Sequence, residues 1–418
     1  AYEIVFGDWT SDVCSSDLGP EIVIVGTSIP DSWALGLLGN ENAVQGLVLN
    51  NFSSTLLRLE GDGNKIMGCY LGTDATGMQR KGNTETAIRC TSASYNIIGG
   101  LDPAQRNIIA GLSRTAIQME ESSRRNQIVG NYIGLKRTGE DTLRNRTGVA
   151  IYFHCPGNII GPGNVISGHI SEGVMLHGKG CDSTRIIGNR IGISADGDRA
   201  LGNDVGIAVY DSASSAFIGS PLASDRNVIS GNRHGIIVSS ELPANNVIQG
   251  NYIGVSAAGD KPLPNRDSGI HLTAVATLIG GSEPGEGNVI SANGVNGLFI
   301  GQDGLNNHIV GNYIGTDTTG TIALPNGHIG IFMGYGASHN LIGPGNHIAF
   351  NGECGVRVME PATAFNTITQ NRIYQNGYIG IELQAGNQRL AAPTITGMSP
   401  VSGTADRKST RLNSSHRI

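Results

Sequence analysis

Short runs in which apolar and polar residues alternate recur along most of this chain, and each run is bounded by Gly, Asn or Ser. The runs have three forms, Asn-x-Ile-x-Gly, Asn-x-Ile and Gly-Ile-x-Ile. Branched residues at every second position predict strands that bury one face, and the small polar residues between them predict turns. No stretch of useful length has a helical period. The pattern therefore predicts an all-β protein.

The runs also repeat at a nearly constant spacing. The motif Asn-x-Ile-x-Gly-Asn-Tyr-Ile-Gly and its variants begin at positions separated by 62, 58, 62, 61 and 59 residues, namely Asn64, Asn126, Thr184, Asn246, Asn307 and Asn366. Each interval also contains a variant of an Asn-x-Ile-Gly…Asn-Val-Ile-Ser-Gly motif and two Gly-[Ile/Val]-x-[Ile/Leu/Val] runs, with Ala87 and Ala116 replacing the glycine in two degenerate copies. One interval therefore holds two coils of three strands each. Self-similarity at a fixed period is typical of a stacked solenoid.

Three short strands cannot enclose a core alone, but identical coils can stack so that their strands form three parallel sheets around an apolar column. We predict a right-handed parallel β-helix of about twelve coils over residues 19–390, its hand following from the bias of parallel crossovers. One set of asparagines should stack into an internal amide ladder: Asn131, Asn189, Asn251, Asn312 and Asn371. Four inserts should emerge as a row of hairpins: Gly134–Asn145, Gly192–Asn203, Gly254–Asn265 and Gly315–Asn326.

The two ends do not carry the repeat. Back-translation of Asp406–His416 and reading of the opposite strand gives nearly the sequence of Asp8–Leu18, so both ends resemble a translated sequencing adapter. We expect residues 1–18 and 406–418 to stay outside the solenoid. Ala392–Thr404 resembles the first strand of an immunoglobulin-like domain, so residues 391–405 are expected to begin a downstream domain.

Composition narrows the classes of partner. Without the two ends, 24 basic residues face 29 acidic ones, and this net charge of −5 disfavours nucleic acid. The 62 glycines fit a turn-rich β protein, and no apolar run is long enough to span a membrane. The cysteines have no zinc-site spacing. Cys69 and Cys90 are expected to be buried, whereas Cys155 and Cys181 fall at similar places on adjacent coils, where a disulfide is one alternative.

These repeats resemble the right-handed parallel β-helix proteins of the pectate-lyase-like superfamily. They are most similar to secreted bacterial repeat proteins with Asn-Tyr-Ile-Gly-Thr-Asp-x-x-Gly and Asn-Val-Ile-Ser-Gly-Asn units, over about residues 21–385. The resemblance implies the fold and a secreted or cell-surface location. It leaves the activity open, because the superfamily includes lyases, hydrolases, epimerases and non-catalytic surface proteins.

The catalytic signatures of these enzymes are missing. The Asn-Thr-Asp, Asp-Asp, Gly-His-Gly and Arg-Ile-Lys motifs of polygalacturonase-like hydrolases are absent, and Gly168-His169-Ile170 fails at its last position. The expected outer faces carry no aspartate cluster like that of calcium-dependent lyases, and the Asp-Pro-His-Glu motif of epimerases is also absent. Asp74 and Asp317 lie in Gly-Thr-Asp turns, where a backbone cap is favoured over calcium binding. No metal or cofactor is expected.

Candidate chemistry lies on the third sheet, which is built from the Gly-Ile-x-Ile strands. Four residues after the strand glycine, Tyr152, His177 and Tyr210 should stack on three consecutive coils, with Lys179 close by. Such a set could abstract a proton beside a uronate carboxyl group, Lys179 supplying positive charge and Tyr210 or His177 moving the proton. The alternative is a half-exposed rim with no chemistry.

Two residues after the strand glycine, His271, Phe299, Phe332 and Arg357 are candidate substrate-binding residues. The phenylalanines would either stack on sugar rings or lie beneath a long loop or neighbouring domain. These observations leave two functions open. One is a monomeric, non-catalytic extracellular module of a larger bacterial protein, for scaffolding, adhesion or polysaccharide binding. The other is a lyase or hydrolase acting on an acidic glycan.

Overall fold

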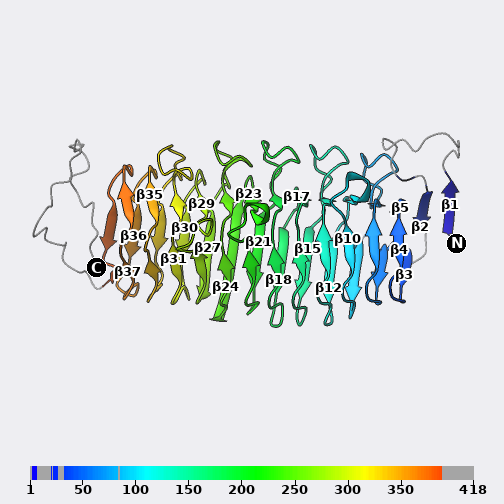
Figure 1. The fold of residues 1–418 in the computed structure, drawn as a ribbon, viewed down its shortest axis with the longest axis horizontal. Coiled ribbons are helices and arrows are strands. Elements are labelled where there is room, and N and C mark those ends of the chain that lie inside the picture. Colours follow the sequence, from blue (N-terminus) through cyan, green and yellow to red (C-terminus); the bar gives the residue numbers. More distant parts are fainter. Residues whose placement is uncertain (1, 7–19, 21, 27–32, 83–84, 388–418) are drawn as a thin grey trace, which may run out of the picture.

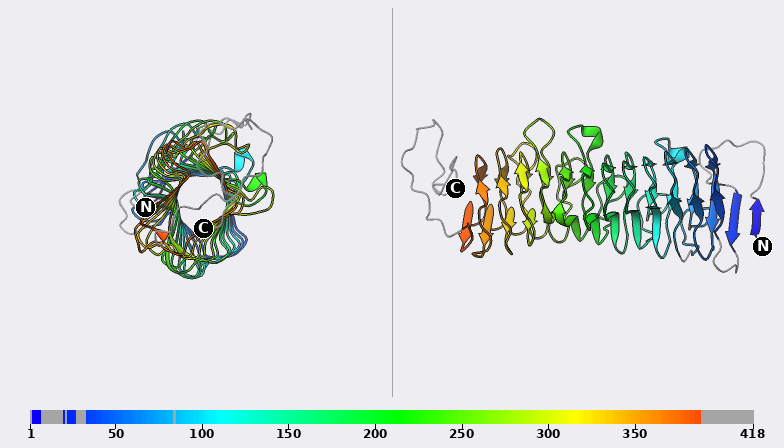
Figure 2. Two further views of the ribbon diagram at one scale, coloured as in Figure 1. Left: turned by 90° about the vertical axis from the view of Figure 1, so that its left-hand side faces the viewer. Right: turned by 90° about the horizontal axis from the view of Figure 1, so that it is seen from below.

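The computed structural model describes residues 2–6, 20, 22–26, 33–82 and 85–387. Within them the chain winds into one solenoid whose strands form three long sheets (Figure 1). Seen along the axis, the coils superpose into a single ring (Figure 2). From Ile22 onward every pairing between neighbouring strands of these sheets is parallel. The predicted right-handed parallel β-helix is thus confirmed, its hand being that of parallel crossovers.

The first sheet holds the Asn-x-Ile-x-Gly strands. Its 12 strands are β4 (Ala43–Gln45), β7 (Lys65–Met67), β10 (Ile97–Gly99), β13 (Gln127–Val129), β16 (Ile159–Ile160), β19 (Arg185–Ile186), β22 (Phe217–Ile218), β25 (Val247–Ile248), β28 (Leu278–Gly280), β31 (His308–Val310), β34 (Leu341–Ile342) and β37 (Thr367–Ile368).

The second sheet holds the Asn-x-Ile strands. Its 14 strands are β1 (Tyr2–Phe6), β2 (Ile22–Gly26), β5 (Leu47–Asn50), β8 (Tyr70–Leu71), β11 (Ile108–Ile109), β14 (Tyr132–Ile133), β17 (Val165–Ile166), β20 (Arg190–Ile191), β23 (Val228–Ile229), β26 (Tyr252–Ile253), β29 (Val289–Ile290), β32 (Tyr313–Ile314), β35 (His347–Ala349) and β38 (Arg372–Tyr374). The short 3₁₀ helices η1 (Pro103–Gln105) and η2 (Ala223–Asp225) precede β11 and β23.

The third sheet holds the Gly-Ile-x-Ile strands. Its 13 strands are β3 (Leu35–Leu37), β6 (Leu57–Leu59), β9 (Ile88–Thr91), β12 (Thr115–Glu120), β15 (Thr147–Tyr152), β18 (Glu172–His177), β21 (Val205–Tyr210), β24 (His234–Pro243), β27 (Ile270–Val275), β30 (Leu298–Ile300), β33 (Ile331–Met333), β36 (Val356–Met359) and β39 (Ile381–Gln384).

The N-terminal end carries one strand of a different kind. Strand β1 pairs antiparallel with β2 over five residues, so it extends the edge of the second sheet without forming a coil. It belongs to the segment 1–18, most of which lies outside the described residues. Residues 391–405 and 406–418 also lie outside them. The assignment of these segments therefore remains a prediction.

The interior consists of apolar columns bordered by asparagine ladders. In the first sheet Ile128, Ile160 and Ile186 align on successive coils and are fully buried. At the adjoining corner, Nδ2 of Asn131 donates to Oδ1 of Asn164 at 3.0 Å and to the carbonyl of Ile98 at 2.9 Å. The predicted ladder is confirmed, and it gains a second set of members: Asn107, Asn164, Asn227, Asn288 and Asn346. Each amide satisfies buried backbone groups that the corners would otherwise leave unpaired.

The predicted row of hairpins is confirmed and has one further member. Antiparallel bridges close five hairpins, at Thr73–Arg80, Leu135–Thr142, Ile193–Ala200, Val255–Pro262 and Thr316–Ala323. They stand over the second sheet, where Tyr132 and Tyr252 belong to apolar clusters beneath them.

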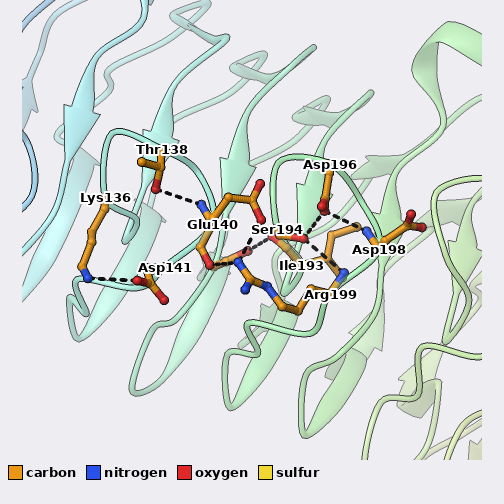
Figure 3. Close-up of polar contacts among 10 residues, drawn as sticks. Lys136, Thr138, Glu140, Asp141, Ile193, Ser194, Asp196, Asp198 and Arg199 are labelled. Atoms are coloured by element: carbon orange, nitrogen blue, oxygen red, sulfur yellow. Dashed lines mark hydrogen bonds and ion pairs between the residues drawn. The ribbon is translucent and has the colours of Figure 1, made fainter.

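Neighbouring hairpins also contact one another (Figure 3). The backbone N–H of Ala195 donates to the carbonyl of Gly139 at 3.0 Å, and the Arg199 guanidinium forms an ion pair with Glu140 at 2.8 Å. The hairpins and their apolar clusters therefore cover much of the outer face of the second sheet.

The aspartates of the Gly-Thr-Asp turns belong to this row. The Asp317 carboxylate accepts hydrogen bonds from the Thr319 hydroxyl and from the backbone N–H groups of Thr321 and Ile322. Asp74 accepts the equivalent bonds from Thr76, Met78 and Gln79. These contacts fit the expected backbone caps.

Candidate functional site

The outer face of the third sheet is hollowed. Residues two positions after the strand glycine lie in one register from Arg89 through to Glu382. Because the strands are parallel and in register, chemically different side chains can form continuous rows along the axis. Three depressions lie along this face.

The structure brings the three predicted aromatic residues together. Tyr152 pairs in register with His177, which pairs with Tyr210 on the next coil. The ring centres of Tyr152 and His177 are 5.9 Å apart. Nε2 of His177 lies 2.8 Å from Oδ2 of Asp211, a residue of the following turn. The predicted proximity is therefore observed.

The environment of the two tyrosines suits hydrogen-bond donation better than proton abstraction. Burial, and then the nearby Glu172 carboxylate, raises the pKa of Tyr152. Burial, followed by Glu172 and Asp204, raises the pKa of Tyr210 to about 12. A general base works best when its pKa lies near the working pH, so both phenols remain protonated at neutral pH.

Lys179 is not drawn into this cluster. Its side chain is exposed in the turn after β18, and its backbone carbonyl accepts a hydrogen bond from His154 at 2.8 Å. Among the described residues, the Lys179 ammonium has no hydrogen-bond or ion-pair partner. Its predicted role beside a substrate carboxylate remains a prediction.

The largest of the three depressions lies over β12, β15 and β18. It has a volume of about 550 Å³, and we call it the charged groove; it is lined by Arg114, Thr115, Gln118, Glu120, Arg146, Thr147, Tyr152, Ser171, Glu172 and Met175. The two arginines and Glu172 come from the beginning of the strands, whereas Glu120 and Tyr152 come from their ends. An extended molecule crossing the groove would therefore meet charges of both signs.

The carboxylates of the charged groove already have partners. Glu120 accepts from Nε of Arg89 at 2.5 Å and from Nε2 of Gln118 at 2.7 Å. Glu172 accepts from the Thr147 hydroxyl at 3.2 Å.

Sequence reasoning missed Arg114, Arg146 and Glu172 because it considered only positions after the strand glycine. Arg146 and Glu172 stand two and one positions before it, and Arg114 stands two positions before Ala116, which replaces the glycine in β12. Aligning those positions from coil to coil would have found them.

A second depression, of about 340 Å³, continues the charged groove toward the N-terminal coils and shares Glu120 with it. Trp33 lies at its far end, and the guanidinium of Arg58 lies 5.9 Å from the centre of the Trp33 ring. Arg58 and Arg89 are register partners on β6 and β9. The N-terminal half of the third sheet therefore presents a continuous polar surface.

The C-terminal half is aromatic. The rings of His271 and Phe299 stack with centres 4.5 Å apart, and those of Phe299 and Phe332 with centres 5.2 Å apart and planes inclined by 8°. We call these three side chains the aromatic platform. The phenylalanines are only half-buried, so the described residues leave part of each ring open to solvent. Tyr335, 59% exposed, flanks both rings.

Arg357 lies next to the aromatic platform, on the strand after Phe332, and forms ion pairs with two carboxylates. Its Nε lies 2.5 Å from Glu382 and its guanidinium 3.0 Å from Glu353. The side chain is 20% exposed. The structure thus places Arg357 beside Phe332, as predicted, but its charge is already neutralised.

The histidines near the platform favour the neutral form. Burial lowers the pKa of His271, and the neighbouring His234 lowers it further. Burial also lowers the pKa of His234, although Asp267 opposes this shift. Neutral imidazole extends the aromatic platform without adding positive charge.

The site shows no arrangement suited to a metal. Among the described residues, no three His, Cys, Asp or Glu side chains converge so that they could hold an ion. His169, from the sequence nearest to a hydrolase motif, is 3% exposed and lies inside the solenoid. Cys155 and Cys181 are buried free thiols, so the structure favours the unbridged alternative. In the described part of the chain, no helix is long and apolar enough to cross a bilayer.

The fold and this open face define a parallel β-helix protein. Comparison with protein-family models gives no match, and comparison with curated proteins gives none either. Among solved structures, the chain is similar to the crystal structure of an alginate lyase from Paenibacillus sp. str. FPU-7. The sequences are 14% identical, the TM-score is 0.29, and the similarity covers 83% of this chain and 98% of that one. A likeness at this level says nothing about activity.

Proposed function

We propose that this protein is a non-catalytic extracellular module that binds a polysaccharide along its third sheet. The observation that carries the proposal is the aromatic platform of His271, Phe299 and Phe332. The three rings stack on one another and are only half-buried, so they present a continuous strip of exposed ring edges, and such an apolar surface can pack against the C–H groups of sugar rings. The platform is built on adjacent strands, so its spacing is rigid before any ligand arrives.

The shape of the third sheet supports the same proposal. A polymer needs a long, straight surface, and the register rows supply one along the whole solenoid. The second sheet offers no such surface because hairpins cover much of it. Adjacent coils are about 4.8 Å apart, so several consecutive sugar units would meet a regular series of side chains.

The alternative, a lyase or hydrolase, has one observation in its favour. The charged groove brings Tyr152 together with two arginines and two carboxylates in one depression. Against it, the raised pKa values of Tyr152 and Tyr210 provide no poised base, and both carboxylates are already bound by neighbouring side chains. We therefore favour binding over turnover.

One set of assays separates the two functions. The purified protein is tested for binding to pectin, alginate and glycosaminoglycans by affinity electrophoresis, and for turnover by ultraviolet absorbance of unsaturated chain ends and by reducing-end release. We expect retardation by at least one polysaccharide without product formation. Product formation that stops on substitution of Tyr152 or His177 would contradict the proposal.

The aromatic platform is tested by the double variant Phe299→Ala/Phe332→Ala. Loss of the two rings should weaken binding at least tenfold, since apolar contact with each contributes about 1 kcal/mol or more. Phe217→Ala is the matched control, because Phe217 is 40% exposed on the first sheet, away from the platform. Equal effects of the control and the double variant would argue against the platform as the binding surface.

A further inference from the structure

A row of side chains runs along the third sheet two residues before each strand glycine, or before Ala87 and Ala116 where alanine replaces it, and we call it the rim row. Its members are joined from coil to coil by backbone hydrogen bonds. Arg146 N–H donates to the Arg114 carbonyl at 2.9 Å, and Ser171 N–H donates to the Arg146 carbonyl at 2.8 Å. The register of the coils therefore holds successive members of this row next to each other.

Most charges in the rim row are neutralised by a neighbour in the same row. Arg114 pairs with Glu85 at 3.3 Å. Arg233 lies between Asp204 and Asp267, at 3.5 and 3.2 Å. His328 lies 2.9 Å from Glu353. Alternation of opposite charges is the favourable arrangement for adjacent strands, whereas like charges directly opposite destabilise.

Arg146 breaks this alternation. Its two neighbours in the row are Arg114, a like charge, and Ser171, which carries no charge. Among the described residues, no carboxylate or carbonyl accepts a hydrogen bond from its guanidinium. Two adjacent coils thus present two arginines of which only Arg114 has an acidic partner. The arrangement leaves a positive position that an anion would fill.

The unmatched guanidinium faces a place where a ligand could lie. Arg146 and Arg114 line the charged groove, together with the Ser171 hydroxyl and the Tyr152 phenol. The raised pKa of Tyr152 keeps its phenol a hydrogen-bond donor at neutral pH. The groove carboxylates Glu120 and Glu172 would repel an anion, but both accept bonds from neighbouring side chains. At the Arg146 end of the groove, Arg114 pairs with Glu85 and Glu172 accepts a bond from Thr147, so Arg146 is the charged side chain there without a described hydrogen-bond or ion-pair partner.

We infer that Arg146, assisted by Arg114, binds a carboxylate or sulfate group of the polysaccharide. This inference rests on the proposed function and adds the charge of the ligand to it. The guanidinium suits both groups, because its planar donors can bind two oxygens at once. Arg146 and Phe299 lie five coils apart, about 24 Å at 4.8 Å per coil. A ligand that contacts both positions is therefore an anionic oligosaccharide at least that long.

The test compares Arg146→Gln with Arg144→Gln. Both residues are exposed and both changes remove one positive charge, but only Arg146 lines the charged groove. Binding is measured by isothermal titration with polygalacturonate oligomers, with their fully methyl-esterified forms, and with sulfated glycosaminoglycan oligomers. The methyl-esterified oligomers keep the sugar units but lack the negative charge. The sulfated oligomers show whether the site prefers sulfate or carboxylate. Circular dichroism verifies that both variants are folded.

We expect the wild-type protein to bind one anionic oligomer more tightly than the neutral ester. Arg146→Gln should weaken that binding about tenfold, as for loss of one charge-assisted contact, without changing binding of the ester. Arg144→Gln should leave both unchanged. Equal loss in the two variants, or equal wild-type affinity for charged and neutral oligomers, would overturn the anion site while the proposed function stands. If no polysaccharide binds at all, the proposed function fails as well.

Discussion

The backbone N–H of His169 donates to Oδ1 of Asn203 at 2.9 Å, which places a histidine inside a column of asparagine amides. Further along this column the amides link to one another, as when Nδ2 of Asn203 donates to Oδ1 of Asn232 at 2.9 Å. The carbonyl groups of Ile133 and Asn145 lie near the imidazole. Neither ring nitrogen is in hydrogen-bond geometry with a partner. The ladder is therefore interrupted at His169.

Restoring the amide should stabilise the protein. In His169→Asn, Nδ2 can donate to Asn203 and Oδ1 can accept from the backbone of Asn145, as at the equivalent positions of other coils. Removing two unsatisfied buried nitrogens should raise the free energy of unfolding by about 1–2 kcal/mol. The urea midpoint measures this. His308→Asn, at an exposed position of β31, is the control and should change stability by less than about 0.5 kcal/mol. A lower midpoint for His169→Asn would contradict the argument.

The same histidine should make the wild-type protein sensitive to acid. Burial lowers the pKa of His169 from 6.5 to about 3, so the unfolded chain binds a proton near pH 6.5 that the folded chain does not bind until near pH 3. Stability is thus fully present above about pH 6.5 and is lost as the pH falls toward 3. The advantage of His169→Asn over wild type should grow by about 1.4 kcal/mol per pH unit in this window. Urea midpoints of both proteins are measured at pH 7, 5.5 and 4.5. A difference between the two midpoints that stays constant over this range would disprove the lowered pKa of His169.

A corner position should be improved by glycine. At the corner between the third and first sheets, most coils have a ladder asparagine or an equivalent threonine. The residue before it has a left-handed backbone, as at Ala276, whose φ is 59°. A non-glycine residue in this region costs about 1 kcal/mol. We expect Ala276→Gly to raise the free energy of unfolding by about 0.5–1 kcal/mol, measured by urea unfolding.

The control for this change is Ala274→Gly, two residues earlier. Ala274 is fully buried within β27 and has an ordinary extended backbone. Glycine there should destabilise by about 1–2 kcal/mol through lost packing and added chain entropy. Effects of the same sign in both variants would show that the corner backbone is not strained.

The buried thiols should be inert in the folded protein. Burial raises the pKa of Cys155 to about 12 and that of Cys181 to about 11, so neither forms the reactive thiolate at pH 8. Peptide mapping after iodoacetamide treatment should show both unmodified, and both alkylated in urea. Ser183→Cys, at an exposed turn position, provides the positive control. A disulfide-linked peptide containing Cys155 and Cys181 would contradict the free-thiol arrangement.

The sequence by itself determined the solenoid, because every coil repeats the same local pattern of strand and turn residues. Alternating branched residues specify strands, and Asn and Gly specify corners such as that at Asn131. Stacking identical coils turns this local pattern directly into tertiary structure. For this reason the three sheets, the ladder, the hairpins and even the register of Tyr152, His177 and Tyr210 could be predicted.

Only the tertiary structure decided what the non-repeating side chains do. Arg146 and Glu172 line one groove, while Lys179, closer in sequence to His177, stays outside it. Arg357 carries the predicted positive charge, but its ion pairs with Glu353 and Glu382 neutralise that charge. Register fixes which residues are neighbours. Whether a neighbour is neutralised, buried or left free depends on the direction and partners of each side chain, and these are set by the surrounding coils rather than by the repeat.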